Sequence, residues 1–285
     1  MTEIKLPAGT AVNLENVPLH QFYHITLHPA TPVVIVASYA IIVHLLNSSR
    51  SKSLSRIEAK RQNEQLLGDR SVIERRSRES GPWMTAFVVL HNLGLAAFSY
   101  WCATNYTTAF AKTVRHEGLR DAYCDANHTI WNDMFKFNYL FYLSKYYELI
   151  DTFIILAKGR KATFLQTYHH AGAITTMWVG CYFGSPQLIF YVVENSIIHT
   201  LMYTYFALTA LGLSPPGKKY LTHLQIFQFL IGLVFIALYI TLPGCLTPLQ
   251  RNLLFVMLSY LIPLIYLFVD FSVKTYGKKR KEKVL

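Results

Sequence analysis

The fold is decided by residues 145–206, KYYELIDTFIILAKGRKATFLQTYHHAGAITTMWVGCYFGSPQLIFYVVENSIIHTLMYTYF. Three apolar segments in this stretch carry side chains that a membrane interior normally excludes, at Lys145, Glu148, Asp151, Gln166, His169, His170, Glu194, Asn195 and His199. Such side chains are costly inside a bilayer and usually face a polar cavity. The stretch therefore predicts membrane helices that surround a functional site.

Apolar residues elsewhere in the chain are also gathered into blocks long enough to cross a membrane. The chain has 285 residues, of which 52% are hydrophobic and 15% are charged. Continuous apolar blocks of this length indicate helices, whereas a membrane barrel would show shorter alternating segments. We expect an all-α polytopic membrane protein with about seven transmembrane helices that enclose a cavity. The expected spans are 28–47, 82–104, 132–157, 161–183, 186–212, 219–243 and 249–271.

The net charge of +11 does not indicate nucleic-acid binding, because the basic residues are confined to a few connections. Twenty of the 27 Lys and Arg residues lie in 48–80, 158–161, 218–219 and 274–283. Seven alternating spans place these segments on one face, which the positive-inside rule assigns to the cytosol. We therefore expect an irregular lumenal segment at 1–27, a helical domain at 28–273 with a basic cytosolic loop at 48–81, and a cytosolic tail at 274–285. The loop is interpreted as a solvated linker or a short surface helix rather than a docking site.

The same topology places Cys124 and Cys245 in lumenal loops, and Cys102 and Cys181 near lumenal helix ends. Four cysteines allow three pairings, and an oxidising lumen permits each of them. We favour a Cys124–Cys245 disulfide, with free buried thiols as the alternative. Glycosylation sequons begin at Asn105 and Asn127, close to predicted helix ends.

The first motif of the stretch is Lys145-Tyr-Tyr-Glu148-Leu-Ile-Asp151-Thr152. Its spacing places Lys145, Glu148 and Thr152 near one stripe of a helix, with Asp151 beside them. The motif predicts one polar network. The alternative is an intrahelical Lys–Glu pair that only neutralises two costly charges.

The second motif is Gln166-Thr-Tyr-His169-His170, where two adjacent histidines suggest metal ligation, or nucleophilic and acid–base chemistry. Scattered positions of the other histidines disfavour a metal, as does the lack of a histidine pair four residues apart on one helix. Buried structural histidines are a further alternative. The other nine histidines are His20, His24, His28, His44, His91, His116, His128, His199 and His223.

Two later segments repeat polar residues at helical spacing. Asn195, His199 and Tyr203 share one face with Met202 and Phe206. Thr222, Gln225 and Gln228 recur every third residue in the next span. Hydrogen bonding that holds helices together is the alternative to a role in the site.

Taken in order, these motifs resemble the ELO family of very-long-chain fatty acid elongases. The resemblance covers about residues 124–230 and rests on the Lys145 motif, the histidine box at 166–170, His199-x-x-Met202-Tyr203-x-Tyr205-Phe206, and Thr222-x-x-Gln225. Two positions depart from the family pattern. Gln166 stands where many members have His, which looks like the variant of lower-eukaryotic and polyunsaturate-type elongases, and Phe206 replaces a usual Tyr.

The resemblance implies condensation of a long-chain acyl-CoA with malonyl-CoA to 3-oxoacyl-CoA, CO2 and CoA, through an acyl-histidine. His169 is then the expected nucleophile, because a position that holds either Gln or His is not essential. His170 would orient His169 or balance its proton, and His199, Asn195 and Lys145 would stabilise the enolate that loss of CO2 leaves. Expected substrate-binding residues are Glu148, Asp151, Gln166, Tyr203 and Gln225, with Lys158, Arg160 and Lys161 for the phosphates of CoA, and Thr176 and Gly180 for the acyl chain.

Small residues follow His169 along its helix. Ala173, Thr176, Gly180 and Gly184 fall within about 60° of its direction, which predicts a groove for the acyl chain over roughly 16 Å. The alternative is that Gly172, Thr176, Gly180 and Gly184 only allow a neighbouring helix to approach.

The resemblance also implies a cellular location and partners. We expect a multi-pass protein of the endoplasmic reticulum membrane with a lumenal N-terminus, and Lys281 and Lys283 resemble a dilysine retrieval signal. The alternative is a basic tail attracted to anionic lipid. Expected partners are the bilayer, the two CoA substrates, and the reductase and dehydratase of the elongation cycle, with no cofactor, metal or nucleic acid. A membrane receptor or transporter and a diiron desaturase or hydroxylase are the competing functions.

Overall fold

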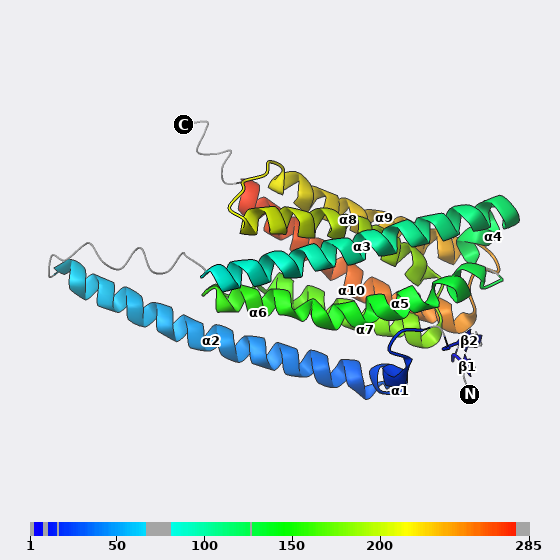
Figure 1. Ribbon diagram of the computed structural model, residues 1–285, viewed down its shortest axis with the longest axis horizontal. Helices are drawn as coiled ribbons and strands as arrows, with labels where there is room; N and C mark the ends of the chain where they lie inside the picture. Colours follow the sequence, from blue (N-terminus) through cyan, green and yellow to red (C-terminus); the bar gives the residue numbers. More distant parts are fainter. Residues whose placement is uncertain (1–2, 8–10, 16, 67–80, 126, 278–285) are drawn as a thin grey trace.

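The computed structural model describes residues 3–7, 11–15, 17–66, 81–125 and 127–277, with the backbone alone for 51–66. Helices dominate, as expected for an all-α membrane protein (Figure 1). In chain order the elements are β1 (Glu3–Lys5), β2 (Ala11–Asn13), η1 (His20–Phe22), α1 (Tyr23–Thr26), α2 (Ala30–Leu66), α3 (Pro82–Glu117), α4 (Leu119–Cys124), α5 (Thr129–Tyr147), α6 (Leu149–Ala157), α7 (Phe164–Phe183), α8 (Gln187–Ala210), α9 (Lys218–Thr241), α10 (Pro248–Ser272) and η2 (Val273–Gly277).

Four of the described helices are long and apolar enough to cross a membrane. They are Ala30–Arg50, Pro82–Glu117, Lys218–Thr241 and Pro248–Gly277. Helices α5, α7 and α8 carry the polar motifs of the sequence, and α6 has nine residues. The fold is thus a polytopic helical membrane protein, and the count of seven spans stays a prediction.

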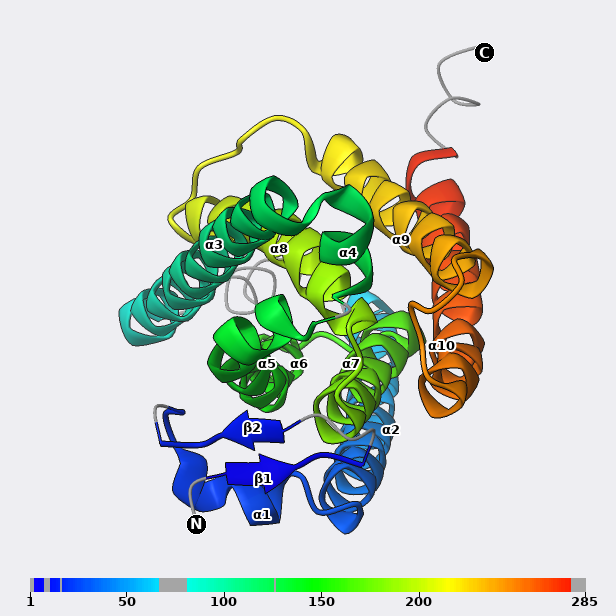
Figure 2. The ribbon, with the colours of Figure 1, turned by 90° about the vertical axis from the view of Figure 1, so that its right-hand side faces the viewer.

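Neighbouring helices close into a ring when the described part is viewed along its long axis (Figure 2). Packed pairs run from α3 to α5, α5 to α7, α7 to α10, α10 to α9, α9 to α8, and α8 back to α3. Helix α2 lies outside this ring, against α7 and α6. The ring, with α5 and α6 as one member, therefore surrounds the interior, and α2 supports it from outside.

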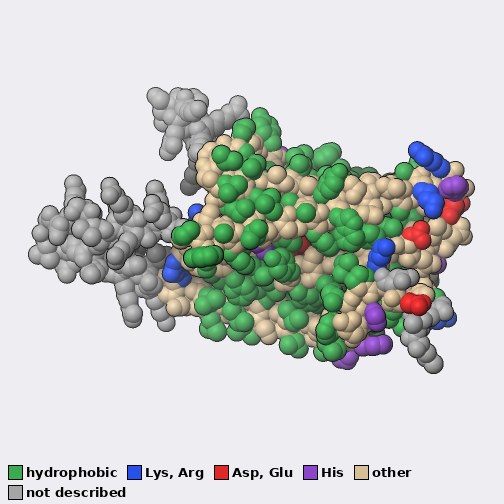
Figure 3. Space-filling model, in the orientation of Figure 1, with side chains coloured by type: hydrophobic (Ala, Val, Ile, Leu, Met, Phe, Trp, Pro, Cys, Tyr) green, Lys and Arg blue, Asp and Glu red, His purple; other side chains and the backbone are tan. Residues whose placement is uncertain are grey.

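The surface matches a membrane environment. Hydrophobic side chains cover the middle of the visible face, and charged side chains gather towards its ends (Figure 3). Exposed apolar residues include Val33 and Ile41 on α2, Phe227 on α9, and Phe255 and Ile262 on α10. The α6–α7 turn, the α8–α9 connection, the end of α2 and the start of α3 lie at one end of the ring (Figure 1). The described residues next to the basic segments thus share an end, as the alternating topology predicts.

Two helices run past their predicted ends. Helix α2 continues to Leu66, and α3 continues through the predicted loop 105–130 to Glu117. In α3, the hydroxyls of Thr107, Thr108 and Thr113 donate to backbone carbonyls four residues earlier. The threonine hydroxyls therefore find hydrogen-bond acceptors within the helix. The helix does not end where the sequence becomes more polar. The prediction of a loop from residue 105 is wrong, whereas the continuation of α2 past the expected span 28–47 agrees with the surface helix considered for 48–81.

The described residues of the N-terminal segment form a hairpin and short helices rather than the irregular segment expected at 1–27. Strands β1 and β2 pair antiparallel, with Ile4 opposite Val12. Val12, Val17 and Tyr23 are buried, and β2 packs against α5. The hairpin therefore packs beside α5, near the end of the ring that lies opposite the α6–α7 turn (Figures 1 and 2).

Two tethers hold the ends of the ring. Cys124 and Cys245 form a disulfide with a Cα–Cα distance of 4.7 Å, which confirms the favoured pairing and joins α4 to the α9–α10 connection. At the other end, Asn47 of α2 donates from Nδ2 to the Ala162 carbonyl at 2.9 Å, and its Oδ1 accepts from Ala162 N–H at 3.0 Å. These bonds fix the turn that leads into the histidine motif.

Candidate active site

The site begins at an interruption between two helices. Helix α5 ends at Tyr147, α6 starts at Leu149, and Glu148 lies between them. Its N–H still donates to the Ser144 carbonyl at 2.8 Å, and its carbonyl accepts from Asp151 N–H at 3.0 Å. The chain therefore continues in nearly the same direction, and the predicted single span 132–157 is two helices joined at a site residue.

Lys145 is the centre of a buried polar network. Its Nζ lies 2.8 Å from Glu148 Oε1 and donates to Asn195 Oδ1 at 3.0 Å. It also lies 3.9 Å from the centre of the Phe141 ring. His199 Nδ1 is 3.9 Å from the same Glu148 oxygen. Only 1% of Lys145 and 2% of Glu148 are exposed. The motif therefore forms a network that includes α8, rather than an isolated intrahelical pair.

Asp151 belongs to a second network. Its Oδ1 lies 2.7 Å from His91 Nε2, and its Oδ2 accepts from the Tyr203 hydroxyl at 2.8 Å. His91 Nδ1 lies 3.1 Å from the Tyr147 hydroxyl. His91 comes from α3, which packs closely along α8. Asp151 and Tyr203 thus bond to each other, and Asp151 also contacts a histidine that the sequence analysis placed among the scattered ones.

His170 is held by its own helix. Thr163 caps α7 by accepting from Gln166 N–H at 3.2 Å, which sets Gln166 one turn before His170. The Gln166 amide Nε2 lies 2.8 Å from His170 Nε2 and 3.5 Å from Thr152 Oγ1. Thr152 in turn lies 2.7 Å from the hydroxyl of Tyr39 on α2. This chain of contacts engages Nε2 of His170.

His169 has a different partner. Its Nδ1 lies 3.2 Å from the hydroxyl of Tyr260, which also donates to the His169 backbone carbonyl at 3.1 Å. The rings of His169 and His170 are 5.4 Å apart. His169 is half-buried, whereas His170 is 4% exposed. The two adjacent imidazoles are therefore held by separate elements, α7 for His170 and α10 for His169.

Other candidates lie away from these networks. Lys158, Arg160 and Lys161 occupy the α6–α7 turn at the end of the ring, where Lys158 is half-buried and the other two are exposed. Burial and the neighbouring Arg160 lower the pKa of Lys158. Gln225 donates to Met202 Sδ at 3.3 Å rather than to a polar network.

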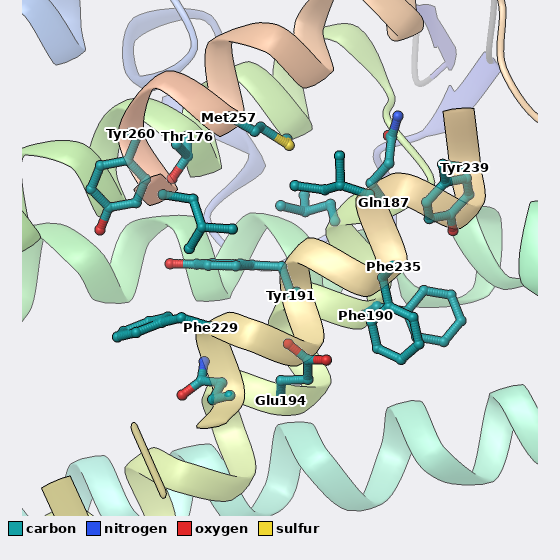
Figure 4. Close-up of a pocket in the computed structure, with 15 residues that line it drawn as sticks. Thr176, Gln187, Phe190, Tyr191, Glu194, Phe229, Phe235, Tyr239, Met257 and Tyr260 are labelled. Atoms are coloured by element: carbon teal, nitrogen blue, oxygen red, sulfur yellow. The ribbon is translucent and has the colours of Figure 1, made fainter. Parts of the chain in front are cut away.

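A cavity opens within the ring beside this site (Figure 4). It extends from Tyr260 and Thr176 past Tyr191 and Phe229 to Tyr239. Its other lining residues are Gln187, Leu188, Phe190, Glu194, Gln228, Gly232, Phe235, Ile236, Met257 and Leu261. Because Tyr260 bonds to His169 and also lines the cavity, an apolar chain in the cavity would end next to that imidazole.

The small residues of α7 either line the cavity or lie against side chains of neighbouring helices. Thr176 lines the cavity directly. A Cβ at Gly180 would lie 2.7 Å from Leu188 Cδ1, and a Cβ at Gly172 would lie 1.9 Å from the Tyr260 ring. Gly180 therefore touches the cavity through Leu188, which is a lining residue, and Gly172 makes room for a partner of His169.

The cavity contains polar atoms that lack partners among the described residues. Both side-chain polar atoms of Gln187 and Oε1 of Glu194 are buried without a hydrogen bond. Glu194 Oε2 lies 3.8 Å from where a Cβ at Gly232 would be. In the polar network around Lys145, His199 Nδ1 and Glu148 Oε2 are likewise buried without a hydrogen bond among the described residues.

Sequence reasoning missed three residues that complete the site: His91, Tyr260 and Tyr39. His91 is a lone histidine within an apolar span, and that was its only signal. Tyr260 follows an apolar run with no motif around it. Their importance comes from contacts between helices that are 60 to 113 residues apart in sequence.

Comparison with known proteins places the chain among lipid enzymes. Residues 24–284 match the family model described as ELO: GNS1/SUR4 family. The chain is 28% identical over 215 residues to fatty acid elongase sre1 of Dictyostelium discoideum, covering 72% of this chain and 79% of that protein. It is 31% identical over 208 residues to very long chain fatty acid elongase 5 of Homo sapiens, covering 67% of this chain and 64% of that protein. It is 35% identical over 155 residues to human very long chain fatty acid elongase 4, covering 50% and 47%.

Proposed function

This chain belongs to the ELO (GNS1/SUR4) family and is a fatty acid elongase, a membrane enzyme of the 3-oxoacyl-CoA synthase type, and we propose that it works through an acyl intermediate on His169. Its substrates are a long-chain acyl-CoA and malonyl-CoA, and no cofactor takes part. The single observation that carries the choice of His169 is its bonding, which differs from that of His170.

A nucleophilic imidazole needs one nitrogen with a free lone pair that faces the substrate. The Gln166 amide occupies Nε2 of His170 at 2.8 Å, so that nitrogen is engaged. His169 is held through Nδ1 by Tyr260, which leaves Nε2 as its attacking atom. Tyr260, the partner of His169, lines the cavity, so the thioester of an acyl chain bound there would lie next to His169.

The first half-reaction forms the acyl-enzyme. Nε2 of His169 attacks the thioester carbonyl, the C–S bond breaks, and CoA leaves as a thiolate that takes a proton from water at the site's mouth. An acyl-imidazole remains reactive enough to pass on its acyl group. His170 supports this step by keeping the neighbouring imidazole in place, with Gln166 holding His170 in turn.

The second half-reaction uses malonyl-CoA. Loss of CO2 leaves an enolate, whose carbon attacks the acyl carbonyl and releases the imidazole with 3-oxoacyl-CoA. Developing negative charge on the enolate oxygen needs donors that are already in place. Lys145 and Asn195 are fixed by their mutual bond, and His199 has a buried nitrogen without a partner among the described residues. These three groups supply the donors, while Glu148 and Asp151 hold them and Tyr203 in position.

The substrates reach the site from the end of the ring that carries the basic turn. Lys158, Arg160 and Lys161 give this mouth a positive potential that attracts the phosphates of CoA. We assign this face to the cytosol and the N-terminus to the lumen of the endoplasmic reticulum, from the distribution of basic residues. The dilysine-like residues 281 and 283 lie outside the described residues. The reductase and dehydratase of the cycle would take the product at this face.

The test is to trap the acyl-enzyme. Purified enzyme is incubated with acyl-CoA in the absence of malonyl-CoA, digested, and analysed by mass spectrometry for an acyl group on the 164–183 peptide. We expect the adduct on His169, its loss in His169→Ala together with condensation of radiolabelled malonyl-CoA, and retention of both in the matched variant Gln166→His. Full turnover by His169→Ala, or an adduct only at another residue, would contradict the assignment.

A further inference from the structure

We propose that Tyr260 is a positioning residue that fixes the tautomer of His169, an inference that rests on the proposed nucleophilic role of His169. Tyr260 lies on α10, which is 91 residues away in the sequence from the histidine that it contacts. Its hydroxyl makes two contacts with the same residue, one to the ring nitrogen Nδ1 at 3.2 Å and one to the backbone carbonyl at 3.1 Å.

The two contacts determine where the imidazole proton lies. A phenol has one proton to donate, and a carbonyl oxygen can only accept. The Tyr260 proton therefore points to the His169 carbonyl, and the phenol oxygen presents a lone pair to Nδ1. Nδ1 must then carry the imidazole proton. In a neutral imidazole this leaves Nε2 with the lone pair, which is the form that can attack a thioester.

The surroundings of Tyr260 hold its hydroxyl at this point. Its ring lies so close to α7 that a Cβ at Gly172 would be 1.9 Å from ring carbon Cε2. Its ring stacks on Tyr168 with 5.6 Å between centroids, and the Tyr168 hydroxyl donates to the Tyr260 carbonyl at 3.2 Å. Gly172 therefore leaves space for the Tyr260 ring. At this position the small residue of α7 lets a neighbouring helix approach and does not line an acyl groove.

The arrangement keeps the proton on Nδ1 through the whole reaction. Formation of the bond between Nε2 and the acyl carbon gives an acyl-imidazolium with its proton still on Nδ1, facing the Tyr260 oxygen, while CoA leaves as a thiolate. Attack of the enolate carbon then breaks the Nε2–acyl bond and returns the neutral imidazole in its starting tautomer. No proton shuttle is needed on this side of the ring. Tyr260 acts by orienting His169 and does not touch the acyl group in these steps.

The experiment measures the acylation half-reaction in the full-length enzyme by rapid quench with radiolabelled acyl-CoA. Tyr260→Phe should slow acyl-enzyme formation by roughly 10- to 100-fold, because His169 then loses its fixed orientation as well as its single tautomer. The KM for acyl-CoA should change little, since the ring that lines the cavity remains. Tyr266→Phe on the same helix is the control, because the Tyr266 side chain is 70% exposed and makes no described contact with His169, and this variant should acylate at nearly the wild-type rate.

Gly172→Ala provides an independent variant, because it displaces the Tyr260 ring without changing either functional group. If both variants act through the same hydrogen bond, Gly172→Ala combined with Tyr260→Phe should be no slower than the slower single variant, whereas independent effects would multiply. Wild-type acylation by Tyr260→Phe, or multiplied effects in the double variant, would overturn the proposal.

A spectroscopic measurement separates this proposal from the one on which it rests. In wild-type enzyme with 15N-labelled histidine, the His169 signals, assigned by their loss in His169→Gln, should show a proton on Nδ1, and Tyr260→Phe should give a mixture of tautomers. A proton on Nε2 in the wild type would overturn the role of Tyr260, whatever the site of acylation. An adduct on another residue together with a proton on Nδ1 would instead contradict the nucleophile and leave the tautomer assignment standing.

Discussion

The polar networks around Lys145 and Asp151 and the cavity occupy neighbouring parts of one ring, and they differ in how fully their polar groups are paired. Around the break between α5 and α6, Lys145, Asp151 and Asn195 each contact at least one fixed partner. Along the cavity, Gln187 and Glu194 have buried atoms without partners among the described residues. A buried polar group with a partner resists removal, whereas one without a partner is already a cost to the fold. Similar residues should therefore respond differently to mutation in the two regions.

The largest effect should come from breaking the buried ion pair on one side. Lys145→Met leaves the Glu148 carboxylate, which is 2% exposed, without its cation, and should lower the free energy of unfolding by about 3–5 kcal/mol. Thermal unfolding of the purified protein in detergent measures this. Lys145→Met combined with Glu148→Gln should recover most of the loss, because no uncompensated charge then remains. If Lys145→Met and the double variant are equally stable, the unpaired Glu148 charge is not the cause of the loss. The ion pair would then not be what holds the networks together.

His91→Leu should have the next largest effect. It removes the partner of Asp151 Oδ1 within the core, at a position that is 3% exposed, and should cost about 1–3 kcal/mol of stability and reduce condensation. His116→Leu on the same helix is the control, since His116 is exposed and should change stability by less than about 0.5 kcal/mol. If His91→Leu behaves like His116→Leu, Asp151 is held by other groups.

Gly180→Leu tests the cavity rather than the networks. The new side chain must displace Leu188, which can turn into the cavity, so we expect a stability cost of about 1 kcal/mol and a shorter longest product, with turnover of short acyl-CoA substrates retained. Gly94→Leu on α3 is matched in size but meets open space, and its product profile should equal that of wild type. An unchanged profile in folded Gly180→Leu would remove this position from the acyl path.

The smallest effect, and the one opposite in sign, is expected at Gln187. Gln187→Leu removes an amide with no described partner and should leave stability unchanged or raise it by up to about 1 kcal/mol. Gln250→Leu is a sharp contrast, because Gln250 is similarly buried but bonds to the Gly184 carbonyl and to Thr247, and its loss should be destabilising. Equal destabilisation by both changes would mean that Gln187 has a partner, such as an ordered water.

Much of this arrangement follows from the sequence, and the remainder has identifiable physical causes. Helical spacing correctly placed Lys145 beside Glu148, and Gln166 one turn from His170, because both pairs are local. Spacing reveals which residues share a face but not which distant helix that face meets. His91 and Tyr260 were therefore missed, although each contacts a candidate residue directly.

Helix ends were predicted least well. Hydropathy marks where a chain leaves an apolar environment, and it does not mark where a helix stops. Helix α3 continues to Glu117 although its last turns are polar, and the next residue is Gly118, whose φ of 86° suits glycine. The break at Glu148 left no signal in the apolar pattern, because the residues on both sides of it are helical.

The position of α2 outside the ring has a consequence for biosynthesis. Its hydrogen bonds from Tyr39, Asn47 and Arg50 are to Thr152, Ala162 and Gly159, which are 113, 115 and 109 residues later in the chain. At roughly 5–20 residues per second, a ribosome needs on the order of ten seconds to deliver them. The first membrane helix to emerge must therefore wait in the lipid, exposing Asn47, until the histidine-bearing helix arrives beside it. A membrane chaperone that shields a polar helix face during this interval would act on α2 before any other part of the enzyme has assembled.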